Sequence, residues 1–322
     1  MLAPDALGPT LCVGEILVEI MATTPGCGFR DVQTLRGPYP SGAPAIFAGQ
    51  CGLMGGRAAM VGAVGADDFG ALTLARLRAD GVDVSAVAVD PDWPTGSAFV
   101  RYRPDGARDF VFNIARSAAA RFDWSDAVQA LVAQAGHLHV MGSALTMRPA
   151  RDVIARAARV IRARGGSLSL DPNLRKELVA EQDALTLFQQ LLDQADLLLP
   201  SGDELFHAAG TPADEAQAVA ALHARGIAEI ALKRGADGAT VYDAGGATRH
   251  PGFHVAETDP TGAGDCFGGA YVTARRLGLP VSGALRLACA AGARNVTVMG
   301  PMEGAGTRAQ LDAFAAAMPV RR

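Results

Sequence analysis

The sequence predicts an α/β protein with a mainly parallel sheet that is covered by helices on both faces. Short apolar runs alternate along the 322 residues with longer segments of helical character, which is the order expected of strand–helix units. Parallel strands that are buried on both faces show such apolar runs. Ligands bind beyond the carboxyl ends of the strands in these sheets, so polar residues there are candidates for function.

The expected elements follow one another in a simple order. The first strand spans Leu11–Met21 and is interrupted by Glu15 and Glu19. Further strands are expected at Arg57–Val64, His137–Met141, Ser167–Leu170, Leu197–Leu199 and Ile227–Lys233. Helices are expected at Phe69–Asp80, Arg151–Arg164, Ala213–Arg225 and Asp265–Leu277. Gly278 ends the last of these, because glycine readily adopts the left-handed conformation found after many helices.

Two stretches break this alternation. Residues 15–40 contain a strand and then an excursion rich in glycine and proline. Residues 95–113 contain two alternating runs on either side of Pro104-Asp105-Gly106, which is the signal of a β-hairpin. Taken alone, the second stretch predicts an ordinary surface hairpin.

Composition and charge limit the possible partners. Hydrophobic residues make up 49% of the chain and charged residues 19%, which suits a well-packed interior. The net charge is −4 with both signs interspersed, so neither a nucleic acid nor a membrane surface is an expected partner. The N-terminus lacks a charged leader followed by an apolar core, and no run approaches the ~20 apolar residues of a membrane span. A cytoplasmic location is therefore expected.

The residues that most often bind metals show no metal-binding pattern. The five cysteines are scattered, odd in number and never in Cys-x-x-Cys spacing. They are Cys12, Cys27, Cys51, Cys266 and Cys289. Neither a zinc site nor a disulfide framework is expected, and a reducing compartment fits. His137 and His139 alternate on one apolar strand, and we expect them to be structural rather than a metal pair.

The run Asp259-Pro260-Thr261-Gly262-Ala263-Gly264-Asp265 carries the clearest chemical signal. Gly262, Ala263 and Gly264 have little or no side chain, so backbone N–H groups there can approach an anion closely. The helix expected behind them adds the positive end of its dipole. A phosphoryl group fits this turn, and Asp265 at the helix entrance is placed to accept the proton of an incoming hydroxyl. The alternative is that Asp265 is only a helix cap.

Other motifs occur along the chain in a specific order. They are Ser41-Gly42-Ala43-Pro44-Ala45, Gly62-Ala63-Val64-Gly65-Ala66-Asp67-Asp68-Phe69-Gly70, Asp171-Pro172-Asn173-Leu174-Arg175 and Lys233-Arg234-Gly235-Ala236-Asp237-Gly238. Together with the 259–265 run, in which Pro260 replaces a frequent threonine, they resemble the motifs of the PfkB (ribokinase-like) carbohydrate kinases. The 171–175 run is similar to that of ketose and ketodeoxysugar-acid kinases.

The resemblance implies a fold. It is a ribokinase-like three-layer α/β/α domain over residues 1–322, with a discontinuous β lid from about 15–40 and 95–116. The lid covers the sugar site and often joins two subunits, so a homodimer is expected.

The resemblance also implies an activity, which is phosphorylation of a primary sugar hydroxyl with ATP, Mg²⁺ and a monovalent cation such as K⁺. A ketose or a 2-keto-3-deoxy sugar acid is the preferred substrate. A nucleoside or other small-alcohol kinase is the alternative within the family. A non-catalytic sugar-binding regulator on the same fold is the alternative from another class.

On the sugar side the resemblance implies five binding residues. They are Glu19, Gly42, Asp171, Asn173 and Arg175. Glu19 would accept hydrogen bonds from adjacent hydroxyls, unless it is only an exposed strand carboxylate. Arg175 would contact a substrate carboxylate or the phosphates, whereas Asp171 could instead cap the following turn.

Two further positions bear on the choice of sugar. Ile46 stands where asparagine is frequent, which removes one polar contact. Only part of the pattern of the keto-acid kinases is kept, and Arg116 could compensate for what is missing.

On the nucleotide side the resemblance implies Ser201, Lys233, Gly235, Gly238 and Cys289, the last at a place where asparagine is frequent. The alternative for Lys233 is a solvated strand end.

The resemblance also implies metal ions at three residues. Glu204 would organise waters around Mg²⁺, or it is simply an acid that satisfies a helix dipole. Asp259 and Thr261 would bind the monovalent cation.

Two competing nucleotide motifs are absent. The chain has no Gly-Lys pair and hence no P-loop, and Gly262-x-Gly264 fails the dinucleotide fingerprint at Phe267.

Overall fold

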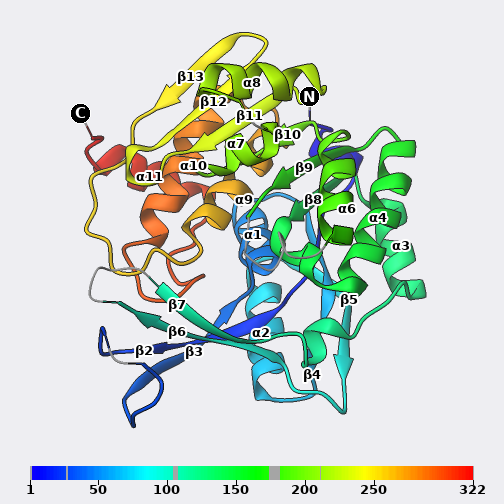
Figure 1. Cartoon of the computed structure of the whole chain (residues 1–322), viewed down its shortest axis with the longest axis vertical. Helices are drawn as coiled ribbons and strands as arrows, with labels where there is room; N and C mark the ends of the chain where they lie inside the picture. Colours follow the sequence, from blue (N-terminus) through cyan, green and yellow to red (C-terminus); the bar gives the residue numbers. More distant parts are fainter. Residues whose placement is uncertain (1, 27, 104–107, 174–181, 211, 322) are drawn as a thin grey trace.

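Two sheets form the framework of the protein (Figure 1). They are described from a computed structural model that covers residues 2–26, 28–103, 108–173, 182–210 and 212–321. The large sheet has nine strands in the order β13-β12-β11-β10-β9-β8-β1-β4-β5. The small sheet has four strands in the order β3-β2-β6-β7.

The large sheet is mainly parallel, as the alternating sequence pattern predicts. All neighbouring pairs from β11 to β5 run parallel, and β12 and β13 add an antiparallel edge. Its strands are β1 (Thr10–Val13), β4 (Ala58–Gly65), β5 (Val82–Asp90), β8 (His137–Met141), β9 (Ser167–Asp171), β10 (Leu197–Leu198), β11 (Glu229–Lys233), β12 (Ala239–Asp243) and β13 (Gly246–His250). The apolar runs therefore become the buried centre of the protein.

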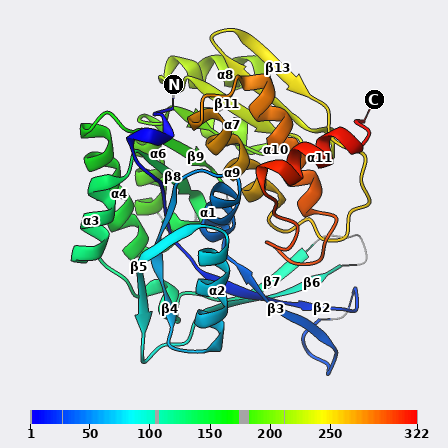
Figure 2. The ribbon, with the colours of Figure 1, turned by 180° about the vertical axis from the view of Figure 1, so that it is seen from behind.

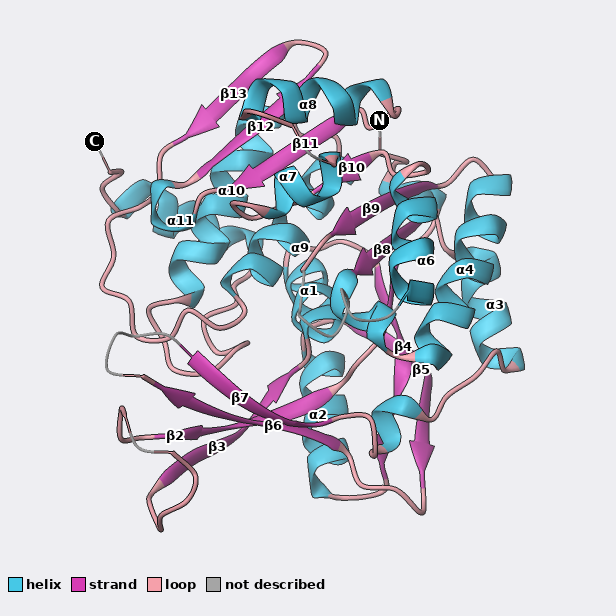
Figure 3. Ribbon diagram, viewed as in Figure 1, coloured by secondary structure: helices cyan, strands magenta, loops and turns pink. Residues whose placement is uncertain are grey.

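Helices cover both faces of the large sheet, which confirms the expected three-layer α/β/α fold (Figures 2 and 3). One face packs against α1 (Ala43–Leu53), α2 (Asp68–Ala79), α9 (Ala263–Arg276), α10 (Val281–Asn295) and α11 (Arg308–Ala317). The other packs against α3 (Asp126–Gln134), α4 (Arg148–Ala163), α6 (Gln182–Leu192), α7 (Glu204–Ala209) and α8 (Glu215–Ala224). None of the described helices is both long and apolar enough to cross a membrane.

The small sheet is built from the two stretches that break the alternation. Its strands are β2 (Leu17–Ala22), β3 (Leu35–Ser41), β6 (Gly96–Tyr102) and β7 (Arg108–Asn113). β2 pairs antiparallel with β3 and parallel with β6, and β6 and β7 form the antiparallel hairpin that the sequence predicts. The predicted turn Pro104-Asp105-Gly106 lies outside the described residues.

The prediction of one strand over Leu11–Met21 is wrong. The segment forms two strands in two different sheets, because the chain leaves the large sheet after Val13 and enters the small sheet at Leu17. Gly14 lies at the break, where a Cβ would be only 2.7 Å from the Pro44 side chain at the start of α1. The close approach of α1 therefore leaves room only for glycine at this break.

Buried polar groups on β8 and β9 bond to one another. The rings of His137 and His139 both lie within 2.8 Å of the Ser169 hydroxyl, and His137 also bonds to Ser167. Burial lowers the pKa of each histidine well below its ordinary value, so both rings are neutral. Among the described residues no cluster of three or more histidine, cysteine or acidic side chains could hold a metal.

The described cysteines are buried free thiols. They are Cys12, Cys51, Cys266 and Cys289, while Cys27 lies outside the described residues. Burial raises the pKa of Cys51 to about 12, so this thiol stays protonated and unreactive.

Arg276 ties the end of α9 to the N-terminal segment. Its guanidinium is buried and donates hydrogen bonds to the carbonyl oxygens of Ala3, at 3.0 Å, and Gly8, at 2.7 Å. It also bonds to the Thr10 hydroxyl at the start of β1. A charged donor with several oxygen acceptors is well satisfied in the interior, so the N-terminal segment and α9 are held together.

Gly42 offers a test of the backbone geometry between the sheets. Its φ is 110°, and a Cβ there would lie 2.3 Å from the Glu15 carbonyl oxygen. Gly42→Ala should lower the free energy of unfolding by roughly 3 kcal/mol or more, since strain adds to a backbone clash. Gly55 is the matched control, with φ 81° and no atom within 4 Å of its Cβ position. Gly55→Ala should cost about 1 kcal/mol. Equal losses in urea denaturation would contradict this account.

Candidate active site

Helix α9 begins at the glycine-rich turn. Gly262 is its N-cap, with a left-handed backbone (φ 79°), and a Cβ there would lie 2.2 Å from the Pro301 carbonyl oxygen. Only glycine fits such a position. The helix starts at Ala263 rather than at Asp265 as predicted, so Asp265 lies within its first turn. The N-cap of this helix is therefore Gly262 and not Asp265.

A cavity of about 420 Å³ lies beside this turn. Ala263 and Gly264 line it. Its walls also include all the residues predicted for the nucleotide, namely Ser201, Lys233, Gly235, Gly238 and Cys289. The structure thus brings together residues from β11, α9 and α10 that lie far apart in the sequence.

Sequence reasoning missed much of this cavity's wall. The additional lining residues include Arg108, Phe253, Val255 and Phe267. Most of these are apolar, as is usual for the walls of a small-molecule site. Gly292 and Val296 also line the cavity, and they have the spacing of one helix face with Cys289, which was singled out from the sequence.

Lys233 and Asp171 form a buried ion pair between β11 and β9. Lys233 Nζ lies 2.5 Å from Asp171 Oδ2, and the two residues are 9% and 1% exposed. Burial opposes the charged form of Lys233, but the carboxylates of Asp171, Glu204 and Asp265 outweigh it and raise its pKa. The lysine is therefore a permanent cation, and its alternative reading as a solvated strand end is wrong.

This cation lies next to the glycine-rich turn. A Cβ at Gly264 would be 3.6 Å from Lys233 Nζ, which is ordinary contact distance. The ammonium group therefore adds a full positive charge to the partial charges of the helix start. Sequence reasoning placed Lys233 and Asp171 in the site but did not find that they pair.

The residues after β9 follow a tight local geometry. The Asn173 N–H donates to Asp171 Oδ1 at 3.2 Å, so Asp171 does cap its own turn while Lys233 holds its other oxygen. Asn173 has a φ of 36°, a left-handed value that asparagine tolerates. Arg175, predicted to contact substrate, lies outside the described residues.

Glu19 lies on β2 of the small sheet. It is 6% exposed, and its Oε1 accepts a hydrogen bond from the Ser41 hydroxyl at 2.7 Å. The alternative reading as an exposed carboxylate is therefore wrong. In register across the sheet, Glu19 pairs with Tyr39 and Ala98, and Ala98 with Phe112. Glu19 is thus the acidic member of a row of apolar and aromatic side chains.

Asp259 organises the loop that leads into the turn. It is fully buried, and it accepts hydrogen bonds from the N–H groups of Thr261 and Gly300, both at 3.0 Å. It also accepts one from the Tyr102 hydroxyl. Burial and the Asp259 carboxylate raise the pKa of Tyr102, so this hydroxyl remains protonated and donates. Neither Tyr102 nor Arg108, which bonds to Thr261, was found from the sequence.

Residues 10–308 match the pfkB family carbohydrate kinase. The chain belongs to this family. It is a sugar kinase, an enzyme that transfers a phosphoryl group from ATP to a sugar. The cavity beside the glycine-rich turn and the buried Lys233–Asp171 pair are thus parts of a pfkB kinase.

Several known relatives resemble this pfkB kinase over most of their length. Fructokinase-1 from Zea mays is 34% identical over 262 residues, which cover 80% of each chain. An E. coli protein provisionally named ribokinase II superposes with a TM-score of 0.92 and 38% identity, covering 96% of this chain and 99% of its own. Fructokinase from Vibrio cholerae O395, bound to fructose, ADP and calcium, gives a TM-score of 0.81 at 26% identity and covers 97% of this chain and 100% of its own.

Asp265 gives the most direct test of the site. Asp265→Asn should fold and bind sugar but turn over at least ~100-fold more slowly, because a positioned proton acceptor is lost. Asp126→Asn is the matched control, since Asp126 is also an acid in the first turn of a helix but lies on α3. Steady-state kinetics should show no loss for the control. Turnover near the wild-type value in Asp265→Asn would remove Asp265 from the reaction.

Proposed function

We propose that this pfkB kinase phosphorylates a primary hydroxyl of a ketohexose, with fructose as the first candidate. The observation that carries the proposal is the position of Asp265 in the first turn of α9, directly after a turn that lines the cavity. The relatives named fructokinase in Zea mays and Vibrio cholerae support the ketohexose.

The proposed reaction is an in-line displacement. Asp265 accepts the proton of the sugar hydroxyl, whose oxygen forms a bond to the γ-phosphorus as the bond to the β-phosphate oxygen breaks. The N–H groups of Gly262, Ala263 and Gly264 and the ammonium group of Lys233 stabilise the charge on the transferred group. They need little rearrangement, because the helix start and the ion pair already hold them in place.

The proposed nucleotide site takes its polar groups from β11 and the segment after β10. Lys233 faces the phosphates, and Gly235 and Gly238 have left-handed φ values of 54° and 86° that shape the turn after β11. Ser201 and Cys289 lie on the remaining walls of the same cavity. ATP would thus bind with its base toward α10 and its phosphates toward α9.

Magnesium fits this site as an ion held chiefly by phosphates and water. Glu204 is the nearby acid that we propose to orient such waters, since Mg²⁺ keeps several of them. Its Oε2 accepts a hydrogen bond from the Ser201 N–H at 2.7 Å, which fixes the carboxylate at the start of α7. When bound, the ion would offset charge on the phosphates.

A monovalent cation such as K⁺ also fits, in the loop around Asp259. Asn295 donates to the Thr261 carbonyl oxygen at 2.8 Å, while its own Oδ1 is buried without a hydrogen-bond partner among the described residues. A buried oxygen of this kind suits a cation that is coordinated by carbonyl groups. We propose that Asp259, Thr261 and Asn295 contribute to such a site.

On the sugar side, the proposal places the substrate between the small sheet and α9. Glu19 accepts hydrogen bonds from sugar hydroxyls, and Gly42 brings the backbone at the start of α1 close to the ring. Asp171 and Asn173 border the site from β9, with Arg175 beyond them. We further propose that the small sheet acts as a lid that excludes water from the reaction.

An anionic sugar acid finds less support than a neutral ketose. Arg116 is exposed and lines a different cavity of about 540 Å³, beside Asp67 and Asp68. Glu19 would repel a carboxylate placed next to it, because like charges in a partly dry site interact strongly. The neutral ketose is therefore the substrate class that we favour.

The substrate class is tested with a panel of acceptors. Fructose should give a kcat/KM at least ~10-fold above that of 2-keto-3-deoxygluconate and of any nucleoside, because one well-placed hydrogen bond to the substrate is worth about this factor.

Glu19→Ala should weaken sugar binding by roughly 10- to 150-fold, since a charged acceptor is lost, while ATP affinity barely changes. Calorimetry on both ligands measures the two effects. Preference for the keto acid, or equal weakening of both ligands, would contradict the assignment.

We also propose a homodimer that forms through the small sheet. Val32, Leu35 and Val111 are 106%, 40% and 51% exposed, and large apolar side chains exposed to this extent favour burial by a second copy. Val111→Glu should shift a dimer toward monomer, because it places a charge in an apolar interface. Light scattering coupled to size-exclusion chromatography measures the mass. A wild-type monomer at micromolar concentration would refute the proposal.

A further inference from the structure

The tip of the small sheet is bonded to the loop that precedes the phosphate-binding turn. Tyr102 and Arg108 form the last register pair of the β6–β7 hairpin. The Tyr102 hydroxyl donates to Asp259 Oδ1 at 2.9 Å, and Arg108 Nη1 donates to Thr261 Oγ1 at 2.7 Å. The two bonds join one end of the small sheet to the connection between β13 and α9 (Figure 1).

The Asp259 carboxylate connects the Tyr102 hydroxyl to the backbone of the loop through hydrogen bonds. Its Oδ1 accepts from both Tyr102 and the Thr261 N–H, and its Oδ2 accepts from the Gly300 N–H. The orientation of the carboxylate therefore fixes the backbone that leads directly into Gly262. A hydrogen bond from a neutral hydroxyl to a buried carboxylate is among the stronger kinds, so Tyr102 helps to set this orientation.

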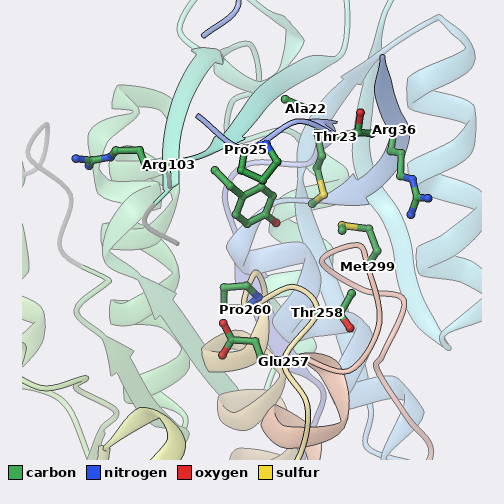
Figure 4. Close-up of a pocket in the computed structure, with 11 residues that line it drawn as sticks. Ala22, Thr23, Pro25, Arg36, Arg103, Glu257, Thr258, Pro260 and Met299 are labelled. Carbon is green, nitrogen blue, oxygen red and sulfur yellow. The ribbon is translucent and has the colours of Figure 1, made fainter. Parts of the chain in front are cut away.

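Part of the tip faces a cavity rather than packed side chains. A cavity of about 560 Å³ separates it from the loop, with walls that include Met21, Pro25, Tyr102, Thr258, Pro260 and Met299. Figure 4 shows the guanidinium groups of Arg36 and Arg103 pointing away from its centre. Where this cavity lies, the tip and the loop do not pack on each other, so the hydrogen bonds of Tyr102 and Arg108 contribute to the attachment at this end.

Arg108 links the same contact to the nucleotide cavity. It lines that cavity, and its guanidinium lies over the Phe110 ring at 5.8 Å from the centroid. Phe110 in turn stacks on Phe112, at 5.1 Å between centroids. A continuous row of side chains therefore runs from Thr261 along β7 to the row that contains Glu19.

We propose that Tyr102 and Arg108 form a latch that holds the small sheet closed and positions residues 259–261 for phosphoryl transfer. Tyr102 is a positioning residue, because it acts through Asp259 rather than on a substrate. Opening the latch admits water to the site and loosens the turn at the start of α9. The kinetic part of this inference rests on the proposed sugar kinase reaction, and the structural part does not.

The structural part is tested by hydrogen exchange on the ligand-free protein. Tyr102→Phe keeps the ring and removes only the donor. Amide exchange in residues 97–102 and 258–261 should accelerate about tenfold or more, which corresponds to one hydrogen bond to a charged group. Tyr242→Phe is the matched control, since the Tyr242 hydroxyl also bonds to a carboxylate, that of Glu215. It should leave both segments unchanged.

The kinetic part compares two reactions of the same enzyme, the phosphorylation of sugar and the hydrolysis of ATP by water. In Tyr102→Phe the kcat of sugar phosphorylation should fall about tenfold, while the ATP hydrolysed per sugar phosphorylated rises several-fold, because water enters an open site. A purely structural role would lower the melting temperature without changing this ratio. Unchanged exchange in both segments, or faster exchange with an unchanged ratio, would overturn the latch. A wild-type enzyme that phosphorylates no ketohexose would instead refute the proposed function, and the exchange result would still decide the latch.

Discussion

Helices α1 and α9 lie so close together that glycine is required between them. A Cβ at Gly269 would lie 2.6 Å from the Phe47 carbonyl oxygen, and one at Gly268 would lie 3.2 Å from the Phe47 ring. The two helices begin at Gly42 and Gly262, which are the proposed sugar-binding and phosphate-binding turns. Their contact in the middle therefore fixes how far apart the two turns are. Phosphoryl transfer depends on that separation, because misplacing the reacting groups by about 1 Å can cost 100-fold in rate.

The electrostatics of the site depend on one ion pair that is buried in the fold and shielded from water. The pairing of Lys233 with Asp171 joins β11 to β9 across β10, in the interior of the large sheet. A buried ion pair is a weak source of stability, since both charges lose their hydration. What it provides here is a fixed cation beside the first turn of α9 before any ligand binds. Such pre-organisation lowers the cost of rearrangement when a charged substrate enters.

Sequence reasoning was most successful where the signal is local. The strand His137–Met141 is found where it was predicted, and the ends of the helix predicted at Phe69–Asp80 differ by one residue from those of α2. The strand over Leu11–Met21 was wrong because the chain changes from one sheet to the other within it, which no local pattern records. The helix start at Ala263 was missed because the left-handed Gly262 already serves as its cap.

Side-chain pairings between distant segments could not be predicted from the sequence. Lys233 and Asp171 were both singled out, yet their partnership depends on the order of strands in the sheet. Tyr102 and Arg108 looked like ordinary members of an alternating hairpin. Their role follows only from the register of β6 with β7 and from the loop that lies against it. A pattern within one segment cannot specify which surface that segment will meet.

The anchoring of Arg276 has a consequence for how the protein is made. Its carbonyl partners belong to residues 3–8, and β1, which follows them, lies inside the large sheet between β8 and β4. Contacts between residues so distant in the chain give a high contact order, and such folds form slowly. During synthesis on the ribosome, α9 cannot dock on the N-terminal segment until residue 276 has emerged. Until then the apolar face that receives α9 is exposed, and such transiently exposed surface favours aggregation of the nascent chain.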